Sequence, residues 1–286
     1  MAIEKVGVIG LGTMGSGITQ VCAESGYQVM ASATSEEKIE RGLTSIEKAL
    51  VKNVEKGKLS PEDKKSILSR IKGIVSATDF SGFSECDLVI EAVTEDLNVK
   101  KKVFTMLDSV CPDHAILATN TSTLSVIDLA RVTNRPDKVL GLHFFTPVPI
   151  MQLVEIVKTI ATSDDTIKAG QKFAKSLGKT SIVAPDIPGL LANRLIASFY
   201  LSAIRMLEAN VATAQDIDTA MRLGYNHPMG PLAVLDLIGL DVFLKAISSI
   251  YEGTNDPQYA PPTLLRKMVA GGRLGRKTGK GFHEYK

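Results

Sequence analysis

A glycine-rich turn near the start of the chain restricts the possible folds more than any other feature. The motif GLGTMG (residues 10–15) follows the β-branched run KVGVIG (residues 5–10), and residues 14–25 after it have helical periodicity. A second β-like run follows at residues 27–32. A GxGxxG motif that ends a strand and opens a helix is typical of dinucleotide-binding folds. The sequence therefore predicts a dinucleotide-binding loop at this turn.

Each glycine of the motif has a physical role in such a loop. Gly10 permits the tight turn, Gly12 lets a pyrophosphate approach the backbone, and Gly15 lets the helix pack close to the strand. The N-terminus of the helix then faces the phosphates. We include the intervening Thr13 and Met14 in the predicted cofactor-binding segment.

The adenosine ribose is expected to bind about 20 positions after the glycines, near Ala33. An acid there would bind the 2′-hydroxyl of NAD. Residues 31–35 read ASATS, with no acid and no Arg or Lys to mark an NADP 2′-phosphate site. Glu36 and Glu37 come slightly late and are expected to start the next helix. The choice between NAD and NADP is left open.

Strand-like and helical segments alternate through the first two thirds of the chain. At 286 residues the chain is too long for a typical single core. The alternation predicts an α/β fold with a Rossmann-type, doubly wound parallel sheet in a dinucleotide-binding domain, residues 1–185. A turn at residues 186–189 precedes a smaller, all-helical domain, residues 186–286, for substrate binding and dimerisation. The expected helices of this second domain are residues 189–210, 214–223, 232–251 and 262–270.

Polar side chains follow three of the expected strands. Glu95 comes after the run at residues 86–92, and Asn120 and Ser122 end the run that starts at residue 115. The apolar run from residue 139 leads to His143. Polar residues at such turns can be helix caps. However, the carboxyl ends of the strands are where open α/β sheets bind ligands, so these ends predict a functional site.

The segment VLGLHFFTPVPIMQLVE (residues 139–155) carries the best candidates for acid–base chemistry. His143 lies near the end of the first β-like run, two prolines interrupt the chain, and a second run brings Glu155. An imidazole with a carboxylate one hairpin later suits proton transfer. The alternative is a structural histidine and a solvated strand end.

Three lysines, Lys52, Lys56 and Lys58, gather at the end of a long charged helix expected over residues 34–58. Such a cluster is either a solvated helix end or a contact for a phosphate-bearing ligand. Over the whole chain the charge is nearly balanced, with a net charge of +2, which argues against nucleic acid as a partner.

The chain is expected to be soluble and cytoplasmic. The N-terminus runs directly into a strand, which leaves no room for a signal peptide. The long apolar run at residues 187–207 is interrupted by Asn193 and Arg194, so no membrane span is expected. Three cysteines lie far apart without a CxxC pair, which favours reduced, buried thiols and no metal site.

The chain resembles the L-3-hydroxyacyl-CoA dehydrogenases, most closely the bacterial 3-hydroxybutyryl-CoA dehydrogenases, over essentially its whole length. The resemblance rests on ordered motifs: GLGTMGSGI, CDLVIEAVTED, ATNTSTLS, RPDKVLGLHFFTPVPIMQLVEIV, IPGLLANRL, AQDIDTAMRLGYNHPMGPL, DLIGLD and GRLGRKTGKGF. It implies hydride transfer between (S)-3-hydroxyacyl-CoA, such as 3-hydroxybutyryl-CoA, and 3-oxoacyl-CoA, such as acetoacetyl-CoA, with NAD or NADP. A homodimer formed through the helical domain is our hypothesis.

The resemblance also implies roles for individual residues. His143 would take the proton of the substrate 3-hydroxyl, and Glu155 would orient its imidazole and stabilise the cationic form. Ser122 would hydrogen-bond the reacting oxygen. Asn193 would complete the polar ring around the substrate carbonyl.

The remaining implied contacts are with the cofactor and with coenzyme A. Glu95 and Lys100 match positions near the nicotinamide and its ribose, and we include Asn120 in the predicted cofactor site. Lys52, Lys56 and Lys58 match the basic segment associated with the coenzyme A phosphates.

The chain departs from the family pattern at two positions. Ala33 replaces the usual ribose-binding acid, and the neighbouring hydroxyl residues 32, 34 and 35 can accommodate a 2′-phosphate, so NADPH use is a hypothesis. Thr146 replaces a common asparagine, which alters substrate positioning. Two other functions compete: a related β-hydroxy-acid or sugar dehydrogenase, which would use a lysine base, and a non-catalytic dinucleotide-binding protein. The His143–Glu155 pairing counts against the first, and the intact set of site residues against the second.

Overall fold

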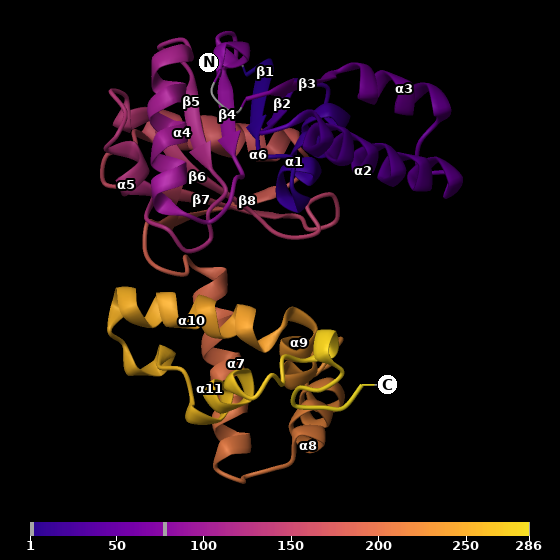
Figure 1. Cartoon of the computed structure of the whole chain (residues 1–286), viewed down its shortest axis with the longest axis vertical. Coiled ribbons are helices and arrows are strands. Elements are labelled where there is room, and N and C mark those ends of the chain that lie inside the picture. The colour runs from indigo at the N-terminus through magenta and orange to yellow at the C-terminus, as the bar shows by residue number, and fades with distance from the viewer. Residues whose placement is uncertain (1–2, 77–78, 286) are drawn as a thin grey trace. The chain divides into compact units, whose positions relative to one another are not determined.

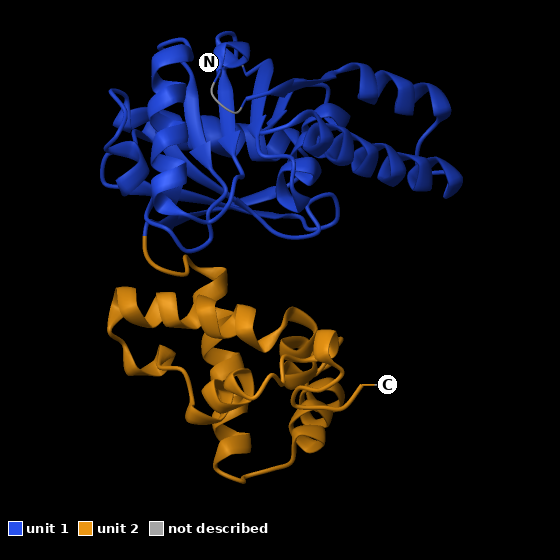
Figure 2. Cartoon of the chain, in the orientation of Figure 1, with its two compact units in different colours: residues 1–186 blue, residues 187–286 orange. Residues whose placement is uncertain are grey.

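The computed structural model describes residues 3–76 and 79–285 (Figure 1). The chain divides into two compact units, Met1–Asp186 and Ile187–Lys286 (Figure 2). The first is built around one sheet, and the described residues of the second form helices together with two isolated β-bridges near its end. A doubly wound sheet followed by a helical domain was predicted from the sequence, and this fold class is confirmed.

The first unit contains an eight-stranded sheet in the order β3-β2-β1-β4-β5-β6-β7-β8. Its strands are β1 (Lys5–Ile9), β2 (Gln28–Ala33), β3 (Ile71–Val75), β4 (Leu88–Glu91), β5 (Ile116–Thr119), β6 (Val139–Phe144), β7 (Leu153–Lys158) and β8 (Thr180–Pro185). The order reverses between β1 and β4, which is the switch point where such sheets bind ligands.

The alternation of strands and helices predicted a parallel sheet. The observed sheet is parallel except for one antiparallel pair. Strands β1 to β6 pair in parallel, whereas β7 pairs antiparallel with β6 and β8 pairs parallel with β7. A short connection joins β6 to β7, and only an antiparallel hairpin can be closed by so short a segment. This hairpin is the one inferred from the two prolines.

Helices cover both faces of the sheet. In Figure 1, α4 and α5 lie on one face and α6 on the other, where α1 and α2 also pack. The helices of this unit are α1 (Thr13–Glu24), α2 (Glu36–Glu55), α3 (Pro61–Ser69), α4 (Leu97–Val110), α5 (Val126–Ala130) and α6 (Asp164–Ser176), with one-turn helices η1 (Ser81–Phe83) and η2 (Pro136–Lys138). As expected, Glu36 and Glu37 form the first turn of α2.

The central strands are buried along their whole length. Every residue of β4, β5 and β6 is buried, as expected for strands with helices on both faces. Such strands are normally continuous apolar runs. Glu91, Thr119 and His143 are exceptions near their carboxyl ends, and a buried polar group is costly unless it is paired. The carboxyl edge of the sheet is therefore the candidate position of a functional site.

The second unit has its own apolar core. It contains α7 (Ala192–Glu208), α8 (Ala214–Thr219), a π-helical turn η3 (Ala220–Gly224), α9 (Pro231–Ile238), α10 (Leu240–Thr254), η4 (Pro257–Tyr259), α11 (Thr263–Ala270) and η5 (Arg276–Thr278). Within the described residues, no helix is long and apolar enough to cross a membrane.

The single helix predicted over residues 232–251 is wrong. The chain breaks at Gly239, which has a φ of 101° and caps both α9 and α10. That conformation is open to glycine and strained for other residues, so the helical periodicity on either side hides a real stop. The C-terminal segment is then held by Asp236, whose carboxylate accepts hydrogen bonds from the backbone N–H groups of Phe282 and His283 and from the Tyr285 hydroxyl.

Candidate active site

The glycine loop has the backbone that a pyrophosphate requires. Gly10 has a φ of 96°, and a Cβ at Gly15 would overlap the Gly10 carbonyl oxygen. Gly12 is the N-cap of α1, and a Cβ there would meet nothing within 4 Å. Each glycine therefore has the property expected from the sequence. The open space at Gly12, in front of a helix N-terminus, fits the phosphates of a dinucleotide.

Two cavities flank this loop. The first, of about 680 Å³, lies against α1, α2 and the segment 146–150. The second, of about 520 Å³, lies against the end of β2 and α4. Leu11, Gly12 and Arg41 belong to the lining of both cavities. The glycine loop and α2 therefore separate two spaces, each of a size that can hold part of an extended ligand.

His143 and Glu155 face one another across the β6–β7 hairpin. They are register partners, and Nδ1 of His143 lies 2.7 Å from Oε2 of Glu155. Both side chains are buried. The sheet register itself fixes this pair, because directly opposed side chains point to the same face. Since Nδ1 contacts the carboxylate, Nε2 is the nitrogen that can exchange a proton with a substrate.

The end of β5 is tied to the end of β6 beside this pair. The Phe144 N–H donates to Oδ1 of Asn120 over 2.9 Å. Thr119 of β5 is the register partner of Gly141 of β6. Ser122 and His143 lie three and two residues beyond this pair along the chain. The structure thus brings Asn120, Ser122 and His143 to one edge, as the sequence predicted.

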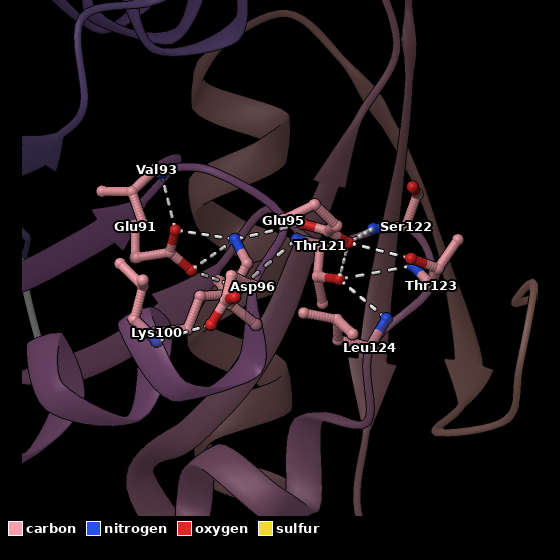
Figure 3. A network of polar contacts seen from close by, with 11 residues as sticks. Glu91, Val93, Glu95, Asp96, Lys100, Thr121, Ser122, Thr123 and Leu124 are labelled. Atoms are coloured by element: carbon pink, nitrogen blue, oxygen red, sulfur yellow. Dashed lines mark hydrogen bonds and ion pairs between the residues drawn. The ribbon is translucent and has the colours of Figure 1, made fainter. Parts of the chain in front are cut away.

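A buried ion pair between Glu91 and Lys100 lies at the same edge, at the end of β4, the neighbour of β5 (Figure 3). Nζ of Lys100 lies 2.7 and 2.9 Å from the two carboxylate oxygens of Glu91, and the side chains are 1% and 0% exposed. Glu91 also accepts hydrogen bonds from the Thr119 hydroxyl over 2.7 Å and the Val93 N–H over 2.6 Å. A buried charge is tolerated only with such a set of partners.

Glu95 extends this network to the segment that contains Ser122 (Figure 3). One of its oxygens lies 3.2 Å from the Lys100 ammonium, and the other accepts hydrogen bonds from the hydroxyls of Thr121 and Thr123 and from the Ser122 N–H. Burial raises the pKa of the Glu95 carboxyl, but the Lys100 charge and these hydrogen bonds outweigh it and hold the pKa below its ordinary value. Glu95 is therefore a carboxylate that fixes the Thr121–Thr123 turn.

The lysine cluster contributes unequally to the first cavity. Lys52 and Lys56 belong to its lining, together with Arg41 of the same helix, whereas Lys58 lies outside it. Thr146 also belongs to this lining, directly before the cis peptide bond to Pro147. The lining therefore combines a basic side on α2 with a largely apolar side from the segment 146–150.

A buried lysine holds that apolar wall in place. Nζ of Lys179 donates to the carbonyl oxygens of Val148 and Met151 over 2.7 and 2.8 Å. Val148 also packs on Gly17 of α1, where a Cβ would come within 2.8 Å of the Val148 side chain. Lys179 was not recognised from the sequence, because a lysine in an αβ turn gives no signal of its distant carbonyl partners.

Ala33, the last residue of β2, is buried and belongs to the lining of the second cavity. Residues 31–35 contain no Arg or Lys, but Lys38 and Arg41 of α2 also line this cavity. Both lie outside the segment in which a basic residue was sought. Asn193 lies in the second unit, in the first turn of α7.

The chain matches known proteins along its whole length. The model of the 3-hydroxyacyl-CoA dehydrogenase NAD binding domain matches residues 5–187, and that of the C-terminal domain matches residues 189–285. A probable 3-hydroxybutyryl-CoA dehydrogenase of Bacillus subtilis is 42% identical over 285 residues, which are 100% of this chain and 98% of the relative. Mitochondrial hydroxyacyl-coenzyme A dehydrogenase of Sus scrofa is 40% identical over 99% of this chain and 92% of the relative.

A solved structure has the same fold. The crystal structure of (S)-3-hydroxybutyryl-CoA dehydrogenase from Ralstonia eutropha superimposes with a TM-score of 0.96 at 41% identity, covering 100% of both chains. The Rossmann-type sheet, the glycine loop and the titratable groups at the strand ends define an NAD-binding oxidoreductase. More particularly, the chain belongs to the 3-hydroxyacyl-CoA dehydrogenase family, whose members oxidise 3-hydroxyacyl-CoA to 3-oxoacyl-CoA. The family resemblance seen in the sequence is confirmed.

Proposed function

We propose that this protein interconverts (S)-3-hydroxybutyryl-CoA and acetoacetyl-CoA, using a bound nicotinamide dinucleotide. The observation that carries the proposal is the His143–Glu155 pair at the carboxyl edge of the sheet, with Nδ1 and Oε2 2.7 Å apart. The relatives named 3-hydroxybutyryl-CoA dehydrogenase support the short acyl chain. When bound, the dinucleotide supplies or accepts the hydride at substrate C3.

The residues of the chain manage the proton. In the oxidation direction, Nε2 of His143 accepts the proton of the substrate 3-hydroxyl, and the buried Glu155 carboxylate stabilises the resulting imidazolium. In the reduction direction, the imidazolium returns the proton as negative charge develops on the substrate oxygen. Ser122 donates a second hydrogen bond to that oxygen, and Asn193 binds the substrate carbonyl. Glu95, Lys100 and Asn120 shape the cofactor side of the site.

The first cavity suits the coenzyme A part of the substrate. Lys52, Lys56 and Arg41 provide cations for its phosphates along one wall. The segment 146–150 provides apolar surface along another, with Thr146 at its start. We assign Lys52 and Lys56 to phosphate binding and Thr146 to substrate positioning; the resemblance implies both roles, and Lys58, which lies outside this cavity, is left out.

The dinucleotide is NAD or NADP, since the NAD-binding domain is present but the acid expected at Ala33 is not. For the assembly, we propose a homodimer through the helical unit. Large apolar side chains on this unit, among them Leu195, Leu223 and Tyr225, are 68%, 78% and 76% exposed, and exposed apolar surface favours association. A molar mass that stays monomeric as concentration rises would exclude the dimer.

The proposed reaction is tested by following acetoacetyl-CoA reduction through the absorbance of the reduced nicotinamide. His143→Gln should lower turnover by about 10²- to 10⁴-fold, the range for loss of a general acid–base group, while dinucleotide affinity stays unchanged. His114→Gln is a matched control. His114 also pairs with a carboxylate, Nε2 lying 3.0 Å from Oδ1 of Asp87, but the two residues precede β5 and β4, at the opposite ends of these strands from the site. Near-normal turnover by His143→Gln would refute the assignment.

A further inference from the structure

The second cavity lies where a doubly wound fold holds the adenosine half of a dinucleotide. Its lining includes the glycine loop, Ala33 and Thr34 at the end of β2, and residues of α4. In such folds the residue that follows the second strand contacts the 2′ position of the adenosine ribose. The groups around Ala33 therefore decide which dinucleotide fits.

The lining of this cavity is positively charged. Lys38, Arg41 and Lys102 contribute to it, and the described lining residues include no Asp or Glu. The acids at the start of α2 lie elsewhere: Glu36 and Glu40 line a separate cavity of about 630 Å³ beside β3. Lys38 and Arg41 of α2 thus line the dinucleotide cavity, whereas Glu36 and Glu40 of the same helix line another one.

Close packing of α2 on the glycine loop explains why its cations reach the cavity. A Cβ at Gly42 would lie 2.7 Å from Cβ of Leu11, so only glycine permits this approach. Lys38 and Arg41 are three residues apart and share one face of the helix. The helix therefore presents an ammonium and a guanidinium on the side of the cavity.

The group that would oppose a 2′-phosphate is missing at the end of β2. An acid at position 33 would accept a hydrogen bond from a ribose hydroxyl and would repel a phosphate. Ala33 does neither. Beside it, Nζ of Lys38 donates to the Thr34 hydroxyl over 2.8 Å, which places an ammonium and a hydroxyl together at the strand end.

We propose that Thr34, Lys38 and Arg41 form a binding site for the 2′-phosphate of NADP(H), so that the protein uses NADPH in preference to NADH. The inference rests on the proposed function, which places the dinucleotide at the glycine loop. A phosphate dianion accepts charge-assisted hydrogen bonds from lysine and arginine, and the guanidinium can bind it in a bidentate manner. The ordinary NAD site offers the opposite charge at this position.

The test measures nucleotide binding without the acyl-CoA reaction. The two probes are adenosine 2′,5′-bisphosphate and adenosine 5′-monophosphate, which differ only in the 2′-phosphate, and calorimetry gives both affinities for the full-length protein. The bisphosphate should bind about tenfold more tightly or better, as expected for charge-assisted hydrogen bonds. NADPH should exceed NADH by a similar factor when titrations are followed by nicotinamide fluorescence.

Variants connect this preference to the proposed residues. Lys38→Ala should reduce it by about tenfold and leave adenosine 5′-monophosphate binding unchanged. Ala33→Asp should reverse the order of NADPH and NADH. Lys48→Ala is the matched control, because Lys48 is exposed on the same helix and lies outside both cavity linings, so the preference should persist.

The outcomes distinguish failure of the 2′-phosphate site from failure of the dinucleotide site. If both probes bind equally, or if NADH binds more tightly than NADPH, the 2′-phosphate site is refuted while the dinucleotide site stands. If neither probe nor either dinucleotide binds, the dinucleotide site and the inference built on it both fail. A preference that persists in Lys38→Ala and in Arg41→Ala would also refute the residue assignment.

Discussion

Replacing Lys100 by Met should destabilise the first unit by about 3 to 4 kcal/mol. Methionine has similar length but no charge, so the substitution leaves the Glu91 carboxylate, 0% exposed, without its ammonium partner. Removing one member of a buried ion pair typically costs about 3 to 5 kcal/mol. Glu91 keeps its hydrogen bonds from Thr119 and Val93, which places the cost near the lower end. The contact with the less buried Glu95 adds at most about 1 kcal/mol.

The assay is amide hydrogen exchange at the buried strands β4 and β5, which reports the opening free energy of the first unit itself. The double variant Glu91→Gln/Lys100→Met should recover much of the loss, because no charge is then left buried alone. Lys168→Met is the control: it breaks the Lys168–Asp165 pair, whose side chains are 67% and 94% exposed, and should cost less than about 0.5 kcal/mol. A Lys100→Met protein as stable as the control, or a double variant less stable than Lys100→Met alone, would refute this reasoning.

Two further predictions concern the first cavity and the thiols. Replacing Lys52 and Lys56 together by Ala should raise the KM for acetoacetyl-CoA about tenfold or more. The KM for acetoacetyl-pantetheine, which lacks the nucleotide phosphates, should stay unchanged. Lys58→Ala should change neither KM, and equal effects of the double variant on both substrates would contradict the assignment. Burial raises the pKa of the Cys86 and Cys111 thiols to about 12, so at pH 8 they remain protonated and iodoacetamide should label them only after unfolding. Mass spectrometry checks this, and labelling of the folded protein at the rate of a free thiol would contradict it.

The elements that could be predicted from the sequence are those with a strong periodic pattern of apolar residues and with glycines at their turns. The strand–loop–helix unit was recognised because each glycine in it has a separate steric reason. The His143–Glu155 hairpin was recognised because two prolines separate two β-like runs. The break at Gly239 was missed, since the apolar pattern continues across it and only the backbone conformation shows the stop.

The site residues that lie at strand ends could be predicted from the sequence. Those that tertiary packing brings to the site from other elements could not. Asn120 directly follows β5, His143 lies near the end of β6, and the parallel order of these strands places both at one edge. In contrast, the partner of Lys100 depends on how α4 packs against β4, which no local pattern records. Lys38 and Arg41 had a usable signal: helical spacing places them on one face, with Thr34 one turn before Lys38.

The position of Arg41 has a thermodynamic consequence. Arg41 belongs to the lining of both cavities, the one proposed for the dinucleotide and the one proposed for coenzyme A. A single side chain cannot serve two phosphates independently, so a ligand that fixes Arg41 on one side changes the free energy of binding on the other. Linkage requires that the two ligands alter one another's affinity by the same factor. Arg41 would thus make occupancy by cofactor and substrate a coupled equilibrium, in which neither dissociation constant is a property of one cavity alone.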